Sequence, residues 1–289
     1  MRIVAPLTLL AALTPTAAQA AWPDDVSLSA LATTNGQPVT NPAASRQAYE
    51  TVVRELGTAI ANKPMAPANT LGLSGFDVAL VNSISFLDSW TDNPSNPAPW
   101  ERVHPDEDPS HVMWTPGLAV RKGLPLSLEV GANVSYIAFS QQTVVGGYGR
   151  WGLVEGYRKY PDINIQLGYA GYIGNDELDL GVMDGSMSIG YTVPFGRRVG
   201  IHEGSFSPYA GAGLLWINAR PQFDAATQQS LGVRPVSGFS GQDSYTEGFR
   251  PANIHLGFRL RSGDFQVLTA TTIAPNSLVT LNAGFGYVY

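Results

Sequence analysis

The chain ends with Ser277-Leu-Val-Thr-Leu-Asn-Ala-Gly-Phe-Gly-Tyr-Val-Tyr289, and this stretch decides the fold. Every second residue from Val279 to Tyr289 is apolar or aromatic, whereas the residues between them are mostly small or polar. Successive side chains of a β-strand point to opposite faces, so a period of two predicts a strand with one apolar face. An edge strand of a soluble β-sandwich and a membrane strand both satisfy this pattern. The rest of the chain has to distinguish them.

The first twenty residues have the composition of a secretory signal peptide. Arg2 supplies the positive charge, Ile3–Leu13 is an interrupted apolar stretch, and Ala18-Gln-Ala20 fits a cleavage site. The apolar stretch is too short for a membrane-spanning helix, which needs about 20 residues. We therefore predict that residues 1–20 are a signal peptide, that cleavage follows Ala20, and that the chain is exported.

The composition excludes several classes of protein. The 289 residues include 17 Lys and Arg against 23 Asp and Glu, and no basic run, so the net charge of −6 argues against nucleic-acid binding. There is no cysteine, which excludes disulfides and a lipidated N-terminal cysteine. No long apolar stretch follows the signal peptide, which excludes a membrane helix. A transmembrane β-barrel stays compatible, because only alternate residues of its strands face lipid.

One amphipathic helix is predicted ahead of the strands. Asn41 can cap it, Pro42 fits its first turn, and Pro64 ends it. Its apolar residues recur at helical spacing and form one stripe: Tyr49, Val52, Val53, Leu56 and Ile60. Residues 21–73 are thus predicted as a periplasmic leader with one helix. The helix either packs on the periplasmic rim of a barrel or enters the barrel lumen as a plug.

From Ser74 the pattern changes to long strands, and about ten can be counted. Their approximate ranges are 74–86, 112–122, 124–140, 143–159, 162–173, 177–193, 205–217, 249–261, 264–273 and 277–289. Most are longer than the strands of ordinary globular sheets and near the length of a tilted membrane strand. Residues 74–289 are therefore predicted as an all-β, antiparallel, up-and-down transmembrane barrel. Its apolar faces would lie against lipid and its polar faces would line the interior.

Turn lengths alternate along the chain as a membrane barrel requires. If the C-terminus lies in the periplasm, short turns fall on that side at 122–123, 159–161, 194–204 and 262–263, and the long segments 87–111 and 218–248 fall on the other. Aromatic residues near predicted strand ends would form an interfacial girdle: Tyr157, Tyr160, Tyr191, Tyr209, Trp216, Tyr287 and Tyr289. The alternation slips near Met183–Ser186, where we predict a β-bulge.

Together these features resemble the small outer-membrane β-barrels of Gram-negative bacteria. The resemblance rests on Ala18-Gln-Ala20, the alternating strands, the unequal loops and the terminal Phe285-Gly-Tyr-Val-Tyr289. Segments such as Glu55-Leu-Gly57 and Arg121-Lys-Gly-Leu-Pro125 are also similar to uncharacterised proteobacterial barrels. The resemblance implies a location in the outer membrane, contact with lipid and lipopolysaccharide, and an assembly signal at Phe285, Tyr287 and Tyr289 for the barrel assembly machinery.

Two groups of side chains are candidate sites. A loop group could bind a divalent cation, since carboxylates suit Ca²⁺ or Mg²⁺ and imidazoles suit transition metals; it comprises His104, Asp106, Glu107, Asp108 and His111. A solvated acidic loop is the alternative. The second group is predicted as a polar cluster in the lumen and comprises Glu129, Arg150, Asn253, His255 and Arg259. As an alternative, His255 would be a general base for a serine or a water.

No sequence motif indicates catalysis or a cofactor. The chain lacks G-x-S-x-G, H-E-x-x-H and a P-loop. We therefore expect no enzymatic activity and no cofactor, and a structural or partner-binding role, such as the membrane anchor of an envelope assembly with a periplasmic or envelope protein partner. The alternatives are a narrow channel or carrier for small or apolar solutes, and a lipid hydrolase or protease.

Overall fold

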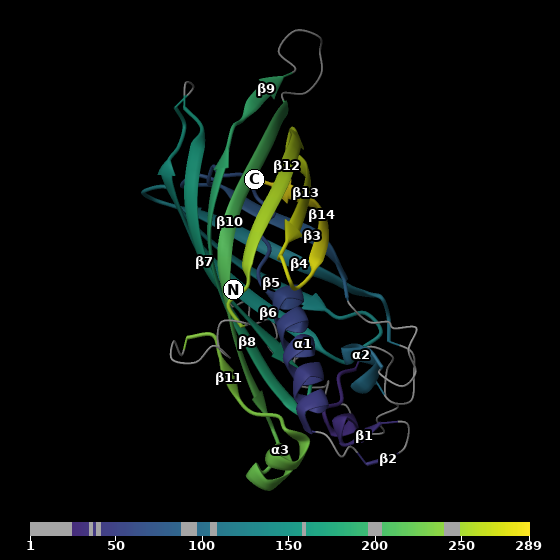
Figure 1. Ribbon diagram of the computed structural model, residues 1–289. Coiled ribbons are helices and arrows are strands. Elements are labelled where there is room, and N and C mark those ends of the chain that lie inside the picture. The colour runs from purple at the N-terminus through teal and green to yellow at the C-terminus, as the bar shows by residue number, and fades with distance from the viewer. Residues whose placement is uncertain are drawn as a thin grey trace, which may run out of the picture.

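The main body of the protein is a closed antiparallel β-barrel of ten strands (Figure 1). The computed structural model describes residues 25–34, 37–38, 42–87, 97–104, 109–157, 160–195, 204–239 and 249–289. The barrel strands are β3 (Phe76–Phe86), β4 (Val112–Leu124), β5 (Leu128–Tyr136), β6 (Thr143–Val154), β7 (Asp162–Ile173), β8 (Leu178–Gly190), β10 (Gly204–Pro221), β12 (Ala252–Ser262), β13 (Phe265–Ile273) and β14 (Val279–Val288). The predicted fold class is confirmed.

Each barrel strand pairs with the next one along the chain, and the last pairs with the first. The β14–β3 ladder runs from Val279 opposite Phe86 to Val288 opposite Asp77, and this seam closes the barrel. The β8–β10 ladder continues the wall across the segment that contains β9 (Val193–Phe195). In β14 the predicted apolar face points outward, where Phe285 is 55% exposed, and the alternate residues point into the barrel and are buried.

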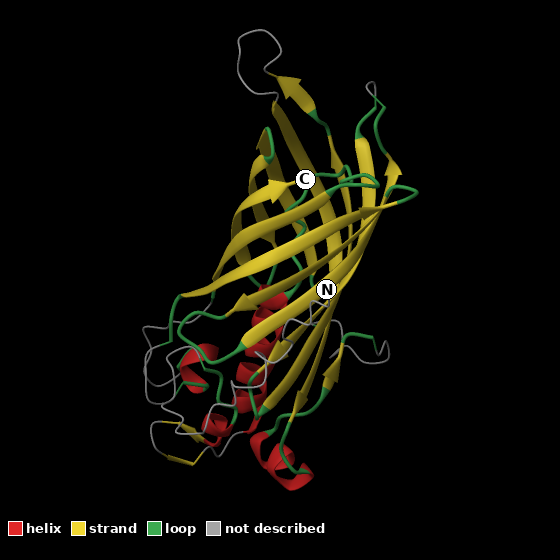
Figure 2. Cartoon of the chain, turned by 180° about the vertical axis from the view of Figure 1, so that it is seen from behind, coloured by secondary structure: helices red, strands yellow, loops and turns green. Residues whose placement is uncertain are grey.

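The smaller elements divide the molecule into two ends. Three helices gather at one end, which we call the cap end: α1 (Pro42–Ile60), α2 (Pro99–Arg102) and α3 (Ala225–Leu231), together with η1 (Ser29–Ala32), β1 (Thr33–Thr34), β2 (Gln37–Pro38) and β11 (Val236–Ser237) (Figures 1 and 2). The chain terminus Tyr289 and β9 lie at the opposite end, which we call the C-terminal end. The two long connections, which contain α2 and α3, are therefore at the cap end, as the loop lengths predicted.

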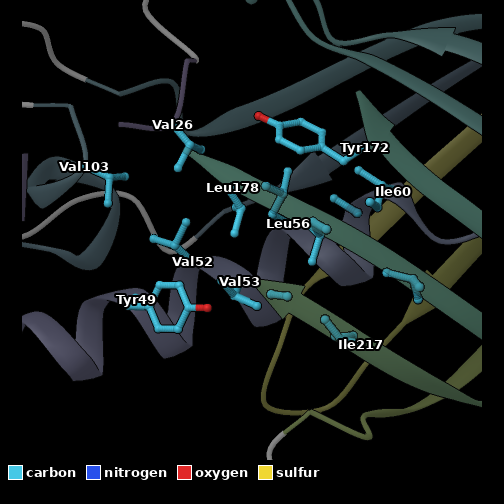
Figure 3. Close-up of a cluster of buried hydrophobic side chains, with 14 of the residues drawn as sticks. Val26, Tyr49, Val52, Val53, Leu56, Ile60, Val103, Tyr172, Leu178 and Ile217 are labelled. Carbon is cyan, nitrogen blue, oxygen red and sulfur yellow. The ribbon is translucent and has the colours of Figure 1, made fainter. Parts of the chain in front are cut away.

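Helix α1 forms where the sequence predicted it, because its apolar stripe has a wall to pack on. All five stripe residues are buried in one apolar cluster with inward-facing residues of β8 and β10, and Figure 3 shows Leu56 of α1 in this cluster with Leu178 and Ile217. Gly57 allows the close approach, because a Cβ atom there would lie 2.7 Å from Ile217 Cγ2. Burial of each large apolar side chain contributes about 1.5–3 kcal/mol. None of the described helices is long and apolar enough to cross a membrane.

Helix α1 lies at the cap end, inside the barrel wall. Helix α1 contacts α2 and α3 in the long connections, and it also contacts β7, β8 and β10. It therefore packs at the cap end and not on the rim that carries the C-terminus. The reason is the apolar wall formed by Leu178, Leu180 and Val182 on β8, which offers the stripe a partner inside the barrel.

Two local predictions are corrected by the structure. No bulge occurs at Met183–Ser186, since β8 pairs without a register shift with both neighbours. The described shift lies at Gly152/Val154 in β6 instead. The predicted turn at 122–123 falls three residues later, where Leu126 and Ser127 both have positive φ. Such left-handed turns usually carry Asn or Gly, so Leu-Ser gave no signal.

Most residues of the predicted aromatic girdle are exposed on the outside of the protein. Tyr157, Tyr160, Tyr191 and the two terminal tyrosines are exposed. Tyr209 is buried at 5% exposure, because it faces the lumen and its hydroxyl donates to the Pro64 carbonyl.

At the cap end, Asp224 caps α3, and hydrogen bonds from the Thr227 side chain and backbone lower the pKa of the Asp224 carboxyl.

Candidate functional site: the plugged lumen

The chain between α1 and β3 runs through the barrel lumen from the end of α1 to the C-terminal end. We call residues 61–75 the threaded segment. Near its start, Asn62 Nδ2 donates to Asp184 Oδ2 of β8 at 2.8 Å and to the Gly147 carbonyl of β6 at 3.3 Å. At its end the chain reaches Phe76, whose N–H and carbonyl pair with Tyr289 at the C-terminal end. The segment therefore occupies the lumen from the end of α1 to the C-terminal end.

The wall holds the threaded segment mainly by its backbone. Three wall side chains donate to its carbonyls: Tyr209 Oη to Pro64 O (3.0 Å), Arg150 Nη1 to Pro67 O (3.2 Å) and Asn164 Nδ2 to Ala68 O (2.8 Å). Two carboxylates accept from its N–H groups: Glu155 Oε1 from Thr70 N (2.8 Å) and Glu129 Oε2 from Leu71 N (3.1 Å). A segment without regular structure has no internal partners for these groups, so the wall must supply them.

A cluster of buried charges lines the C-terminal half of the lumen. Arg121 forms an ion pair with Asp77, and its Nη1 lies 3.6 Å from Glu129 Oε1. Arg150 Nη1 lies 3.5 Å from the same Glu129 oxygen, and Arg150 Nη2 donates to Gln166 Oε1 at 2.8 Å. Two guanidinium groups thus lie close to two carboxylates in a site with little access to water.

A small cavity remains beside the threaded segment. Its volume is about 70 Å³, and it lies between residues 59–66 and the inner faces of β3, β4, β5, β6 and β13. Its lining combines apolar side chains such as Val81 and Leu268 with polar ones such as Ser83, Thr115 and Asn133. The cavity has room and hydrogen-bonding partners for a few water molecules. It is too small for a large solute.

The structure places all five residues of the predicted lumen cluster inside the barrel, but it brings only some of them together. Glu129 and Arg150 meet, as described above. Arg259 Nη2 lies 3.4 Å from Asn69 Oδ1 of the threaded segment. His255 Nε2 instead shares a hydrogen bond of 2.8 Å with Ser188 Oγ of β8, and Asn253 is buried nearer the cap end of β12.

Sequence reasoning missed two members of the charge cluster, Asp77 and Arg121. Both sit at inward-facing positions of predicted strands, and this alternation was a usable signal. Their contact follows from the β3–β4 register, in which they are opposite each other. The sequence also did not indicate that the threaded segment would be the main partner of the lumen side chains.

The Ser188–His255 pair resembles the start of a catalytic arrangement but is incomplete. Both side chains are buried, with His255 at 0% exposure. His255 Nδ1 has no hydrogen-bond partner in the described part of the chain. A serine nucleophile needs a base that is oriented by a third group and a path for the substrate. The described geometry supplies neither.

The predicted metal-binding loop is only partly described. His104 is buried, stacks on Trp100 with ring centroids 5.9 Å apart, and its Nδ1 lies 2.8 Å from the Trp100 carbonyl oxygen. His111 is exposed. Residues 106–108, the three carboxylates of the prediction, lie outside the described residues. Across the described ranges, no group of three His, Asp or Glu is arranged to hold a metal ion.

The predicted assembly-signal residues form part of an aromatic cluster on the outer face at the C-terminal end. Phe285 and Tyr287 of β14 contact Phe265 of β13, with ring centroids 5.9 and 5.6 Å apart. Tyr289 is 81% exposed at the end of the chain. All three side chains are accessible from outside the barrel.

No protein-family model matches the chain, and no curated protein sequence does either. Similar solved structures include the KdgM porin, with 6% identity, 73% of this chain and 98% of that chain covered, and a TM-score of 0.29. Ail of Yersinia pestis has 9% identity, covers 75% and 99%, and has a TM-score of 0.27. Outer membrane protein Omp33 of Acinetobacter baumannii has 10% identity, covers 74% and 99%, and has a TM-score of 0.25. These neighbours are outer-membrane β-barrel proteins. At such low TM-scores, the fold of this chain rests on its own strand pairing.

Proposed function

We propose that the protein is an outer-membrane barrel that its own N-terminal segment keeps closed, and that it serves as a structural, partner-binding anchor in the envelope. Its outer face supports the membrane placement. Large apolar side chains on that face are strongly exposed around the whole wall, for example Leu80 (62%), Val134 (52%), Leu167 (55%) and Leu256 (53%). A soluble protein rarely exposes such a continuous apolar surface, whereas a membrane barrel covers it with lipid.

The observation that carries the anchor role is the threaded segment. Five backbone groups between Pro64 and Leu71 are hydrogen-bonded to the wall, and α1 fills the cap half of the lumen with apolar side chains. A ten-stranded barrel is already near the size at which side chains fill the interior. With a peptide added, an open aqueous pore has no room. The partner-binding surface is then the cap, built from η1 and α1–α3.

This placement gives the two ends different environments. The C-terminal end faces the periplasm, and the cap faces outward among the lipopolysaccharide headgroups and a protein partner of the envelope. The long connections on the cap end support this orientation. The exposed aromatic residues Phe285, Tyr287 and Tyr289 are the proposed contact for the barrel assembly machinery.

The orientation is tested by labelling single cysteines on intact cells. The chain contains no cysteine, so each introduced thiol is unique. Ala226→Cys lies on exposed α3 at the cap, and Ser262→Cys is its matched exposed position at the C-terminal end. A membrane-impermeant maleimide is expected to label the first on intact cells and the second only after the outer membrane is permeabilised. Labelling of Ser262→Cys alone on intact cells would overturn the orientation.

A narrow channel is the second candidate function, and the cavity beside the threaded segment favours it. The cavity extends along the inner faces of β3 and β4 from Ser83 to Arg121. A path for water or small ions along it would be blocked at the C-terminal end by the charge cluster. Conduction would require movement of the cluster or of the whole threaded segment.

Planar-bilayer recordings separate the anchor from the channel. We expect no openings from the wild-type protein. The Thr58 and Ser277 hydroxyl oxygens are 2.9 Å apart, so Thr58→Cys/Ser277→Cys is suited to form a disulfide that fixes α1 to the β13–β14 turn. Discrete channel openings in recordings of the wild-type protein would contradict the anchor proposal. Openings that persist in the oxidised double variant would indicate a path through the cavity, whereas openings restored only by reduction would indicate displacement of the plug.

We also propose that the protein is not an enzyme and that Ser188–His255 is a structural pair. The pair is enclosed between β8 and β12, and the cavity lining does not include it. Loss of lipid or peptide hydrolysis in His255→Ala, measured against wild-type protein in the same lipid, would contradict this assignment.

A further inference from the structure

The outer face of the barrel carries two polar side chains in the middle of its strands. At outward positions of the described barrel strands, the other Ser, Thr, Asn and charged side chains lie within three residues of a strand end: Lys122, Thr143, Asp179, Asn218, Arg220, Ser262 and Thr271. Asn82 and Thr269 lie farther in, the latter at the centre of β13. Strand ends reach the headgroup region, where polar groups are tolerated, but strand centres face hydrocarbon.

These two residues belong to one row across the barrel seam. Asn82 of β3 is opposite Ala283 of β14, and Ala283 is opposite Thr269 of β13 (strands labelled in Figure 1). Along β3 the apolar residues Leu80 and Ile84 flank Asn82, and along β13 Val267 and Thr271 flank Thr269. We call Asn82, Ala283 and Thr269 the seam row. It is a small, polar patch within the apolar belt.

The Asn82 amide is only half satisfied within its own chain. Trp114 Nε1 of β4 donates to Asn82 Oδ1 at 3.3 Å. Asn82 Nδ2 has no acceptor within the described part of the chain, and the residue is exposed on the outer face. Lipid tails cannot accept its two N–H bonds, so an isolated barrel leaves them unpaired in hydrocarbon.

We propose that the seam row is the contact between two copies of this chain in the membrane. A carboxamide is both donor and acceptor, so two Asn82 side chains related by a two-fold axis can donate to each other, which suits an isologous dimer. Ala283 and Thr269 are small, which allows two walls to approach closely, as small residues do at interfaces within membranes. This inference rests on the proposed membrane placement.

The test measures energy transfer between labelled copies of the full chain in liposomes of phosphatidylcholine. Fluorophores are attached at Ala226→Cys on the exposed cap, away from the seam, and transfer is followed as the ratio of lipid to protein is raised. Asn82→Leu should weaken dimerisation about tenfold, the equivalent of about 1.4 kcal/mol. This variant matches the apolar neighbours of the site, and heat-modifiable gel migration verifies that it still folds.

Matched tryptophan variants locate the contact. Ala283→Trp places a bulky ring in the seam row and should abolish transfer. Leu167→Trp places the same ring on exposed β7, across the barrel, and should leave transfer unchanged. Wild-type protein that floats with liposomes but stays monomeric, transfer that Asn82→Leu does not reduce, or equal effects of the two tryptophans would each overturn the dimer. Protein that does not float with liposomes would instead overturn the membrane placement.

Discussion

Removing the charge of Glu129 tests whether the buried charge cluster stabilises the threaded segment in the lumen. Glu129 Oε2 accepts from Leu71 N of the threaded segment, and Oε1 lies 3.6 Å from Arg121 Nη1 and 3.5 Å from Arg150 Nη1. Glu129→Gln keeps the size and one acceptor oxygen but removes the charge. Arg121 keeps Asp77, whereas Arg150 is left without a carboxylate. Breaking a buried ion pair in this way costs about 3–5 kcal/mol.

The matched control is Glu155→Gln. Glu155 accepts from the N–H and hydroxyl of Thr70, the residue before Leu71, and no described cation pairs with it. A glutamine oxygen can still accept these bonds, so its cost should be near 1 kcal/mol. At 2–4 °C per kcal/mol for a chain of this size, Glu129→Gln should lower the unfolding midpoint by roughly 10 °C, and Glu155→Gln by a few degrees.

The assay is the temperature at which the folded gel band of the detergent-solubilised protein disappears. The double variant Glu129→Gln/Arg150→Gln should recover part of the loss, because removing both partners leaves no uncompensated charge. If Glu129→Gln and Glu155→Gln shift the midpoint equally, the buried charge cluster does not stabilise the plugged lumen and the reasoning fails.

Three further predictions concern the packing of α1 and the Ser188–His255 pair. Ile217→Ala removes apolar contacts with α1 and should cost about 2–5 kcal/mol in the same assay, more than Leu214→Ala at an exposed outward position of the same strand. Gly57→Val should cost about 1–3 kcal/mol, because the new side chain overlaps Ile217; an unchanged midpoint would mean that α1 is loosely packed. His255→Ala should cost about 1–3 kcal/mol by leaving the buried Ser188 hydroxyl without its partner, and a destabilisation below this range would show that the pair is not structural.

The strands of the barrel could be predicted from the sequence, because the alternation of apolar and polar residues within each strand distinguishes its outer face from its inner face. Alternation of Leu281, Ala283 and Phe285 with buried small or polar residues required only a period of two, and the seam with β3 followed from closure. The stripe of α1 was equally local, at a period of 3.6. Pairwise contacts such as Asp77 with Arg121 also needed the β3–β4 register, and the long connection that contains α2 joins these strands without a short turn that would fix it.

The contents of the lumen could not be predicted from the strands alone, because the polarity of the inward side chains follows that of the segment packed against them. At the cap half the inward residues of β8 are Leu178, Leu180 and Val182, which face the apolar stripe of α1. Farther along the same strand the inward residue is Asp184, which faces Asn62 of the threaded segment. The change from apolar to polar looked like a slip in alternation when β8 was considered alone. It marks the point where the plug changes from a helix, which satisfies its own backbone, to an extended segment that needs the wall to do so.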